Sequence, residues 1–265
     1  MVLTAPAIMA LTSTMNNLTS DLNTMWLFSN TKKFRDSGLL QGFTDWHSHL
    51  LPGVDDGIRT MEESLATLDA FEREGVKRVW LTPHIMEDSP NSTQRLRDRF
   101  EDLKNEYKGG VELRLASENM LDSLFEERLE SNDFLPLGEE GNHLLVETSY
   151  VNPPYGMEDM IERVKELGYT PVLAHPERYR YMNKDDYHKW KDMGLLFQCN
   201  YMSLIGGYGD TAREKCEWLL KEGMIDLTGS DTHRRNIFEH ILDKKPKKQS
   251  LMDTLVQIAQ NPKLQ

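Results

Sequence analysis

Histidine and aspartate side chains crowd into residues 43–57, which read FTDWHSHLLPGVDDG. The first half of this segment has the composition of a strand, and residues two apart share one face of a strand, so His47 and His49 are expected to point the same way. The loop that follows adds Asp55 and Asp56. Neutral imidazoles and carboxylates without a thiolate are ligands of hard or borderline divalent cations, so this segment predicts part of a metal site.

More potential ligands lie where other predicted strands end. Strands are predicted over residues 43–49, 78–84, 111–118, 143–148, 170–175, 195–200 and 225–231. The carboxyl ends of parallel strands meet on one rim of a barrel, so residues that are distant in sequence converge there. The predicted metal ligands are His47, His49, Asp56, His84, Glu118, Glu147, His175, Asp231 and His233.

Helical segments alternate with these strands. The first helix is predicted to begin at Thr60, which forms a capping box with Glu63, and to end at Gly75. Later helices are predicted over residues 92–107, 121–131, 157–167, 184–193, 211–222 and 250–260. Strands alternating with helices predict an α/β fold with a parallel sheet, and this number of units favours a barrel. The absence of a G-x-G-x-x-G turn argues against dinucleotide binding.

A structural role is the more common explanation for any one buried histidine or glutamate. The whole set resists that explanation, because it would gather four carboxylates whose mutual repulsion costs a few kcal/mol per close pair. Bound cations remove this repulsion. The remaining histidines, His143, His188 and His240, are interpreted as structural.

Composition limits the classes of function. The chain has 265 residues and a formal net charge of −12, which argues against a nucleic-acid partner. The short basic run KKPKK at residues 244–248 is interpreted as a solvated segment. The only cysteines are Cys199 and Cys216, and no apolar run reaches the roughly 20 residues that span a bilayer, so a soluble cytoplasmic protein is expected.

Two regions are predicted along the chain. Residues 1–42 are expected to be an N-terminal leader, and residues 43–265 a single catalytic domain. Residues 1–24 contain one charged side chain and no basic start. They are interpreted as a disordered leader or as an extension before a start at Met25.

Several segments, taken in order, resemble the motifs of a known superfamily. The segments are DWHSHLLPGVDDG, LTPH, ASENMLD, LVETSYVNPPYG, LAHPERY and GSDTH. They resemble the PHP (polymerase and histidinol phosphatase) superfamily and, more narrowly, the bacterial manganese-dependent protein-tyrosine phosphatases of capsular and exopolysaccharide loci. The resemblance implies a distorted seven-stranded (β/α) TIM-like barrel, a site for three divalent cations, and hydrolysis of phosphotyrosine on a partner kinase or its phosphorylated tail.

The resemblance also implies roles for individual residues. The ligands of the family fall on the nine positions given above, and its phosphate-binding arginine falls on Arg178. A second such arginine corresponds to Arg234 or Arg235. One departure from the family pattern is the sequence Ser-Glu-Asn around Glu118, where an Ala-Glu-Tyr type sequence is usual.

The expected reaction is in-line attack on phosphorus by a hydroxide that bridges the metals, with Arg178 contacting the phosphate oxygens. Manganese is favoured by the resemblance, whereas the ligand types also admit iron, zinc or magnesium. Tyr155, together with Tyr150, is interpreted either as an aromatic lip for the substrate ring or as structural packing.

Other functions stay open at this point. A phosphatase acting on a small molecule such as histidinol phosphate would use the same metals, and an amidohydrolase or a non-catalytic regulator of a kinase is less favoured. A cysteine-based phosphatase is excluded because it needs an arginine six positions after its cysteine, where Cys199 has Ile205 and Cys216 has Glu222.

Overall fold

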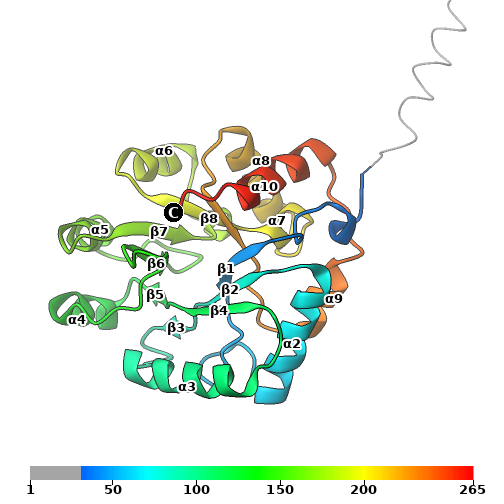
Figure 1. The fold of residues 1–265 in the computed structure, drawn as a ribbon. Helices are drawn as coiled ribbons and strands as arrows, with labels where there is room; N and C mark the ends of the chain where they lie inside the picture. Colours follow the sequence, from blue (N-terminus) through cyan, green and yellow to red (C-terminus); the bar gives the residue numbers. More distant parts are fainter. Residues whose placement is uncertain (1–30, 265) are drawn as a thin grey trace, which may run out of the picture. The chain divides into compact units, whose positions relative to one another are not determined.

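The computed structural model describes residues 31–264 (Figure 1). The predicted leader therefore lies outside the described residues as far as residue 30, and so does the alternative start at Met25. From Lys32 onward the chain forms a compact unit, so residues 32–42 pack with the predicted catalytic domain. Phe34, for example, is fully buried, and its ring centroid lies 4.9 Å from that of Tyr201.

The strands pair in parallel and form two sheets. The smaller sheet has the order β1 (Thr44–Ser48), β2 (Arg78–Leu81) and β4 (Glu112–Leu115). The larger sheet has the order β3 (His84–Ile85), β5 (Glu118–Met120), β6 (His143–Glu147), β7 (Thr170–Ala174), β8 (Leu196–Asn200) and β9 (Leu227–Gly229). The parallel α/β fold predicted from the sequence is confirmed.

Two predicted strands are each divided between the two sheets. The second predicted strand breaks after Leu81 into β2 and β3, because Pro83 has no N–H with which to continue the ladder. The third breaks at residues 116–117 into β4 and β5. A single closed seven-stranded barrel is therefore not confirmed, since no continuous ladder joins the two sheets.

Backbone contacts nevertheless connect β1 with the end of β9. The N–H of Asp231 donates to the carbonyl of His47 at 2.7 Å, and the N–H of His49 donates to the carbonyl of Thr232 at 3.1 Å. Gly229 makes this approach feasible, because a Cβ at that position would lie 2.7 Å from the Cβ of His47. The first and last strands thus lie side by side.

The predicted helices are present, with small shifts at their ends. They are α2 (Met61–Glu74), α3 (Thr93–Glu106), α4 (Ser123–Ser131), α5 (Met157–Glu166), α6 (Lys184–Asp192), α8 (Asp210–Lys221) and α10 (Gln249–Gln260). Helix α2 begins and ends at the predicted residues: the Thr60 hydroxyl oxygen accepts a hydrogen bond from the N–H of Glu63 at 3.2 Å, which is one half of the predicted capping box, and Gly75 ends the helix with φ of 99°. Figure 1 shows helices at the periphery and strands between them.

Four short helices were not predicted. They are the 3-10 turns η1 (Phe34–Asp36) and η2 (Pro176–Arg178) and the helices α7 (Tyr201–Leu204) and α9 (Arg235–Ile241). Helices of one or two turns are marginal by themselves and depend on packing that local sequence does not reveal. In α9, for example, the buried ring of Phe238 packs 4.4 Å from that of Phe71 in α2.

The helices pack on the strands through apolar side chains. Leu68 and Phe71 of α2 and Val79 of β2 are buried in one large cluster. A smaller cluster includes Trp46 and Trp80, whose rings stack with centroids 5.9 Å apart. No helix among residues 31–264 is both long enough and apolar enough to cross a membrane.

Candidate metal centre

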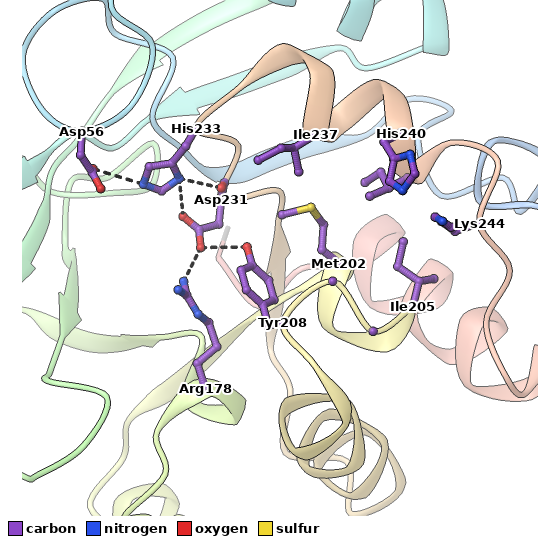
Figure 2. Close-up of a pocket in the computed structure, with 13 residues that line it drawn as sticks. Asp56, Arg178, Met202, Ile205, Tyr208, Asp231, His233, Ile237, His240 and Lys244 are labelled. Carbon is purple, nitrogen blue, oxygen red and sulfur yellow. Dashed lines mark hydrogen bonds and ion pairs between the residues drawn. The ribbon is translucent and has the colours of Figure 1, made fainter.

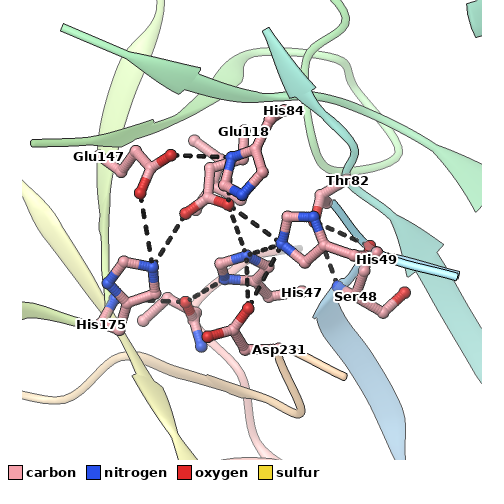
Figure 3. A network of polar contacts seen from close by, with 12 residues as sticks. His47, Ser48, His49, Thr82, His84, Glu118, Glu147, His175 and Asp231 are labelled. Atoms are coloured by element: carbon pink, nitrogen blue, oxygen red, sulfur yellow. Dashed lines mark hydrogen bonds and ion pairs between the residues drawn. The ribbon is translucent and has the colours of Figure 1, made fainter. Parts of the chain in front are cut away.

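The nine predicted ligands lie together at the carboxyl ends of the strands. Figure 3 shows seven of them, and Figure 2 shows Asp56 and His233. Glu118, at the start of β5, is their centre and is fully buried. Its Oε2 lies 3.0 Å from His47 Nε2 and 3.1 Å from His49 Nε2. The same oxygen lies 3.2 Å from His84 Nδ1, and Oε1 lies 3.0 Å from His175 Nε2. One carboxylate therefore faces four imidazoles that come from three different strand ends, two of them from β1.

The other carboxylates extend the cluster outwards. Asp231 Oδ1 lies 3.3 Å from His49 Nε2 and 3.4 Å from His233 Nδ1. Asp56 Oδ1 lies 3.3 Å from His233 Nε2, and Glu147 Oε1 lies 2.8 Å from His84 Nδ1. These contacts divide the cluster into four overlapping groups, each compact enough to hold one ion. The groups are His49–Asp56–His84–His233, His47–His49–Asp231, His47–Glu118–His175 and His84–Glu118–Glu147.

The hydrogen bonds behind the cluster fix which nitrogens of two histidines face inwards. His49 Nδ1 lies 2.9 Å from a carboxylate oxygen of Asp55, and His47 Nδ1 lies 2.7 Å from the amide oxygen of Gln198. Both acceptors require an N–H at Nδ1, so each neutral ring turns a lone pair on Nε2 into the cluster. These two Nε2 atoms are 3.1 Å apart and both face Glu118. Lone pairs that converge in this way fit a divalent cation.

The charges of the cluster point to the same conclusion. Burial and the neighbouring His49 would lower the pKa of His84, but the carboxylates of Glu118 and Glu147 outweigh them and raise it to about 9. Burial would raise the pKa values of Glu118 and Asp231, yet the surrounding imidazoles hold both well below their usual range. The carboxylates are therefore ionised, and a metal ion and a proton would compete for the same nitrogens.

Two ligands occupy an uncommon backbone conformation. Among the described residues other than glycine, φ is positive only at Asn132, His175 and Asp231. His175 (φ 33°) follows β7 directly, and Asp231 (φ 51°) lies just after β9. The left-handed region is unfavourable for side chains with a Cβ and persists where the surrounding structure imposes it, often at functional sites. At these two positions it turns the chain sharply at a strand end, and the side chain faces the cluster.

Arg178 lies at the edge of the cluster in η2, three residues after His175 (Figure 2). Its Nη1 donates to Asp231 Oδ2 at 2.6 Å. The guanidinium lies between two aromatic rings, 4.4 Å from the centroid of Tyr150 and 4.3 Å from that of Tyr208. Burial would lower the pKa of Arg178, but Asp231 raises it overall, so the side chain stays cationic. A fixed planar cation beside a metal site is suited to bind the oxygens of a phosphate.

The other predicted substrate-binding residues do not face the cluster in the same way. Arg234 donates from Nη1 to the carbonyl oxygens of Asp56 and His233, at 2.7 and 2.6 Å, and so supports the loop that carries Asp56. Arg235 is exposed and lies 3.5 Å from Glu239. Tyr155 is 99% exposed and lines a separate hollow beside Trp190. Of Arg178, Arg234, Arg235 and Tyr155, only Arg178 donates a hydrogen bond to the side chain of a predicted metal ligand among residues 31–264.

Several residues around the site were not predicted from the sequence. Gln198 orients His47, and Asp55, which lies beside the predicted ligand Asp56 in the sequence, orients His49. Tyr208 donates its hydroxyl to Asp231 Oδ2 at 3.1 Å while its ring covers Arg178. The one signal for Tyr208 is its place in a glycine-rich loop after the sixth predicted strand. Gln198 carries no such signal.

Comparisons with known proteins agree with this geometry. A family model described as "Capsular polysaccharide synthesis, CpsB/CapC" matches residues 43–249. The tyrosine-protein phosphatase YwqE of Bacillus subtilis (strain 168) is 27% identical over 202 residues, which cover 71% of this chain and 76% of YwqE. The tyrosine-protein phosphatase CpsB of Streptococcus agalactiae serotype V is 28% identical over 212 residues, which cover 73% of this chain and 84% of CpsB.

The fold is also found among solved structures. One chain from the crystal structures of YwqE from Bacillus subtilis and CpsB from Streptococcus pneumoniae, unique metal-dependent tyrosine phosphatases, matches with a TM-score of 0.66. The match has 22% sequence identity and covers 84% of this chain and 96% of that chain. At this level of identity it shows that the two chains share a fold.

Proposed function

Because the chain belongs to the CpsB/CapC family, we propose that it is a metal-dependent protein-tyrosine phosphatase whose substrate is a bacterial tyrosine kinase, or the phosphorylated tail of one, in capsular or exopolysaccharide synthesis. The observation that carries the proposal is the cluster around Glu118 with Arg178 at its edge. A cytoplasmic location is part of this proposal, because the sparing use of cysteine fits a reducing compartment.

The proposed cofactor is a set of three divalent cations, with manganese as the first choice. The four overlapping groups share His47, His49, His84 and Glu118, so neighbouring cations would share ligands. When bound, such cations would lower the pKa of a coordinated water, which supplies a hydroxide nucleophile at neutral pH, and would also neutralise the charge of the phosphate oxygens. The residues that would hold them are the nine ligands predicted above. Asp55 and Gln198 would keep two of the imidazoles in the binding tautomer.

Arg178 is proposed to bind the phosphoryl group. Its Nη1 donates to Asp231, and no hydrogen bond within residues 31–264 engages its Nε or Nη2. Those two donors are free to contact two oxygens of a phosphate in the bidentate manner typical of arginine. The leaving tyrosine has an ordinary pKa near 10 and makes little demand on a general acid, so the site needs no further proton donor.

The strands are proposed to form the distorted seven-stranded barrel that the sequence predicts, with residues 43–265 as the catalytic domain and residues 32–42 packed against it. Counting β2 with β3 and β4 with β5 as two interrupted strands leaves seven strands in the order of the chain. The hydrogen bonds between the segments of His47 and Asp231 support closure between β1 and β9.

The proposed function can be tested with purified protein loaded with Mn²⁺. We expect it to hydrolyse a phosphotyrosyl peptide faster than the matched phosphoseryl peptide, because phenolate leaves more readily than an alkoxide. We also expect a chelator to abolish turnover. Histidinol phosphate, an amide and a lactone serve as comparison substrates. Faster turnover of histidinol phosphate than of the phosphotyrosyl peptide would contradict the proposed substrate.

A further inference from the structure

A cleft of about 630 Å³ leads away from the metal cluster along α9 (Figure 2). One end is formed by the metal-site residues Asp56, Asp231 and His233 together with Arg178. The cleft then continues between the loop after α7 and one side of α9. A substrate whose phosphate reaches Arg178 would therefore have the adjoining part of its chain beside α9.

The middle of the cleft is apolar. Met202 and Ile205 line one wall, and Ile237 and Ile241 of α9 line the other. Ile237 is 45% exposed, and it is one of few large apolar side chains so exposed in the described part of the chain. An exposed apolar side chain inside a cleft that is continuous with a polar site is suited to contact a ligand.

The far end of the cleft is basic. His240 and Lys244 line it. His240 lies on α9, three residues after Ile237, and Lys244 lies three residues past the end of this helix at Ile241. Both are exposed, and no ion pair within residues 31–264 involves either side chain. The neighbouring carboxylate of Asp243 pairs with Lys33, at 2.9 Å, and not with Lys244. His240 had been interpreted as structural, and Lys244 as the start of a solvated basic run.

From these contacts we propose that the cleft binds the peptide segment next to the phosphotyrosine, taking an aliphatic side chain against Ile237 and an acidic side chain at Lys244 and His240. The inference rests on the proposed function, because it assumes that a phosphotyrosine occupies the metal site. The charge complementarity is local: the chain carries a net charge of −12, yet this end of the cleft is lined by a lysine and a histidine.

The separation of Ile237 and Lys244 sets the spacing of the two side chains. They are seven positions apart, four of them on α9 up to Ile241 and three in the turn beyond it, and a helical rise over seven positions would be about 10 Å, roughly three residues of an extended peptide. The acidic residue is therefore expected about three positions beyond the aliphatic one, on the side away from the phosphotyrosine. The preferred peptide thus has the order phosphotyrosine, aliphatic residue, acidic residue.

The experiment compares two phosphotyrosyl peptides that differ by one glutamate-to-glutamine change at the acidic position. The full-length Mn²⁺-loaded protein is used, and p-nitrophenyl phosphate serves as a substrate too small to reach α9. We expect the wild-type protein to favour the acidic peptide by up to about fivefold in kcat/KM, through KM, because an exposed ion pair contributes up to about 1 kcal/mol. Lys244→Glu should remove or reverse this preference while turnover of p-nitrophenyl phosphate stays the same.

Lys247→Glu is the matched control, because it makes the same change of charge at an exposed lysine that does not line the cleft. It should keep the preference for the acidic peptide. A second readout is the Kd of the same two peptides with a non-hydrolysable phosphonate in place of the phosphate, which should show the same difference.

The two proposals can fail separately. Equal kcat/KM and equal Kd for the two peptides, with p-nitrophenyl phosphate hydrolysed, would overturn the cleft proposal and leave the phosphatase proposal standing. The cleft proposal would also fail if Lys247→Glu removed the preference as fully as Lys244→Glu. No hydrolysis of any phosphotyrosine substrate would overturn the proposed function and this inference with it.

Discussion

Arg178 illustrates how single residues are positioned in this site. Its guanidinium is held by Asp231 on one side and by the rings of Tyr150 and Tyr208 on its faces. Cation–π contacts of this kind are worth about 0.5–1 kcal/mol when exposed and more when buried. The arginine is thus held in place before a substrate arrives, which reduces the conformational entropy lost on binding.

Replacing Arg178 by alanine should lower kcat/KM for a phosphotyrosyl peptide by about 100-fold, because the phosphoryl oxygens would lose a preorganised charged donor. Metal content should stay the same, since Arg178 is not a predicted ligand. The measurement is steady-state kinetics together with metal analysis of the same sample.

Arg163→Ala is the matched control, because Arg163 lies on α5, outside the cluster, and pairs with Glu130 there. It should leave kcat/KM unchanged. Unaltered turnover in Arg178→Ala would remove this residue from the mechanism, and loss of metal would assign it a structural role instead.

Among the elements, β1 and β9 decide whether the ligands meet. These strands carry or immediately precede His47, His49, Asp231 and His233, and the two segments approach closely only because Gly229 has no side chain. An added Cβ would lie 2.7 Å from the His47 Cβ and 2.8 Å from its backbone nitrogen. The backbone cannot move aside without displacing the metal ligand.

Gly229→Ala is therefore expected to destabilise the fold by about 1–3 kcal/mol, as overpacking of a tight core does. It should also weaken metal binding, because His47 must shift. Chemical denaturation measures the first effect, and calorimetric titration with Mn²⁺ measures the second.

Gly223→Ala provides the comparison for this variant. Gly223 follows α8 with φ of 68°, and an added Cβ there would meet no atom within 4 Å. This change should cost stability through backbone strain alone, with Mn²⁺ affinity retained. Equal affinity in both variants would contradict the role assigned to Gly229.

At the scale of the whole molecule, metal binding and folding should be coupled. The cluster joins side chains from six strand ends, counting each interrupted strand once, and a cation that bridges them would bind only the folded chain. The same side chains repel one another or must take up protons when no metal is bound. Metal ions in these groups are therefore expected to stabilise the fold as well as to serve its chemistry.

Removal of the metals should lower the melting temperature of the protein. Saturation at about 100 times Kd contributes roughly 2.7 kcal/mol for one site, which corresponds to a shift of about 5–10 °C for a domain of this size. Differential scanning calorimetry with Mn²⁺ and with a chelator measures this shift. Glu118→Gln should reduce the shift, because Glu118 belongs to two of the groups, and identical melting temperatures with and without Mn²⁺ would contradict the coupling.

The sequence by itself determined the class of fold and the chemical character of the site. Apolar periodicity and capping residues act within a few positions, so the βα alternation and the placement of His84 or His175 at a strand end could be predicted locally. The resemblance to the phosphatase family, drawn from ordered motifs, is confirmed by the match over residues 43–249.

Only the tertiary structure decided how these elements meet. Pro83 interrupts a predicted strand. Asp55 lies behind His49, whereas the adjacent Asp56 faces His233. Tyr208 covers Arg178 from a loop that is distant in the sequence. The cleft along α9 likewise joins residues that local patterns left unrelated, among them His240 and Lys244. The physical reason is that local sequence sets conformational preference and polarity, whereas the contacts between side chains depend on how distant segments pack.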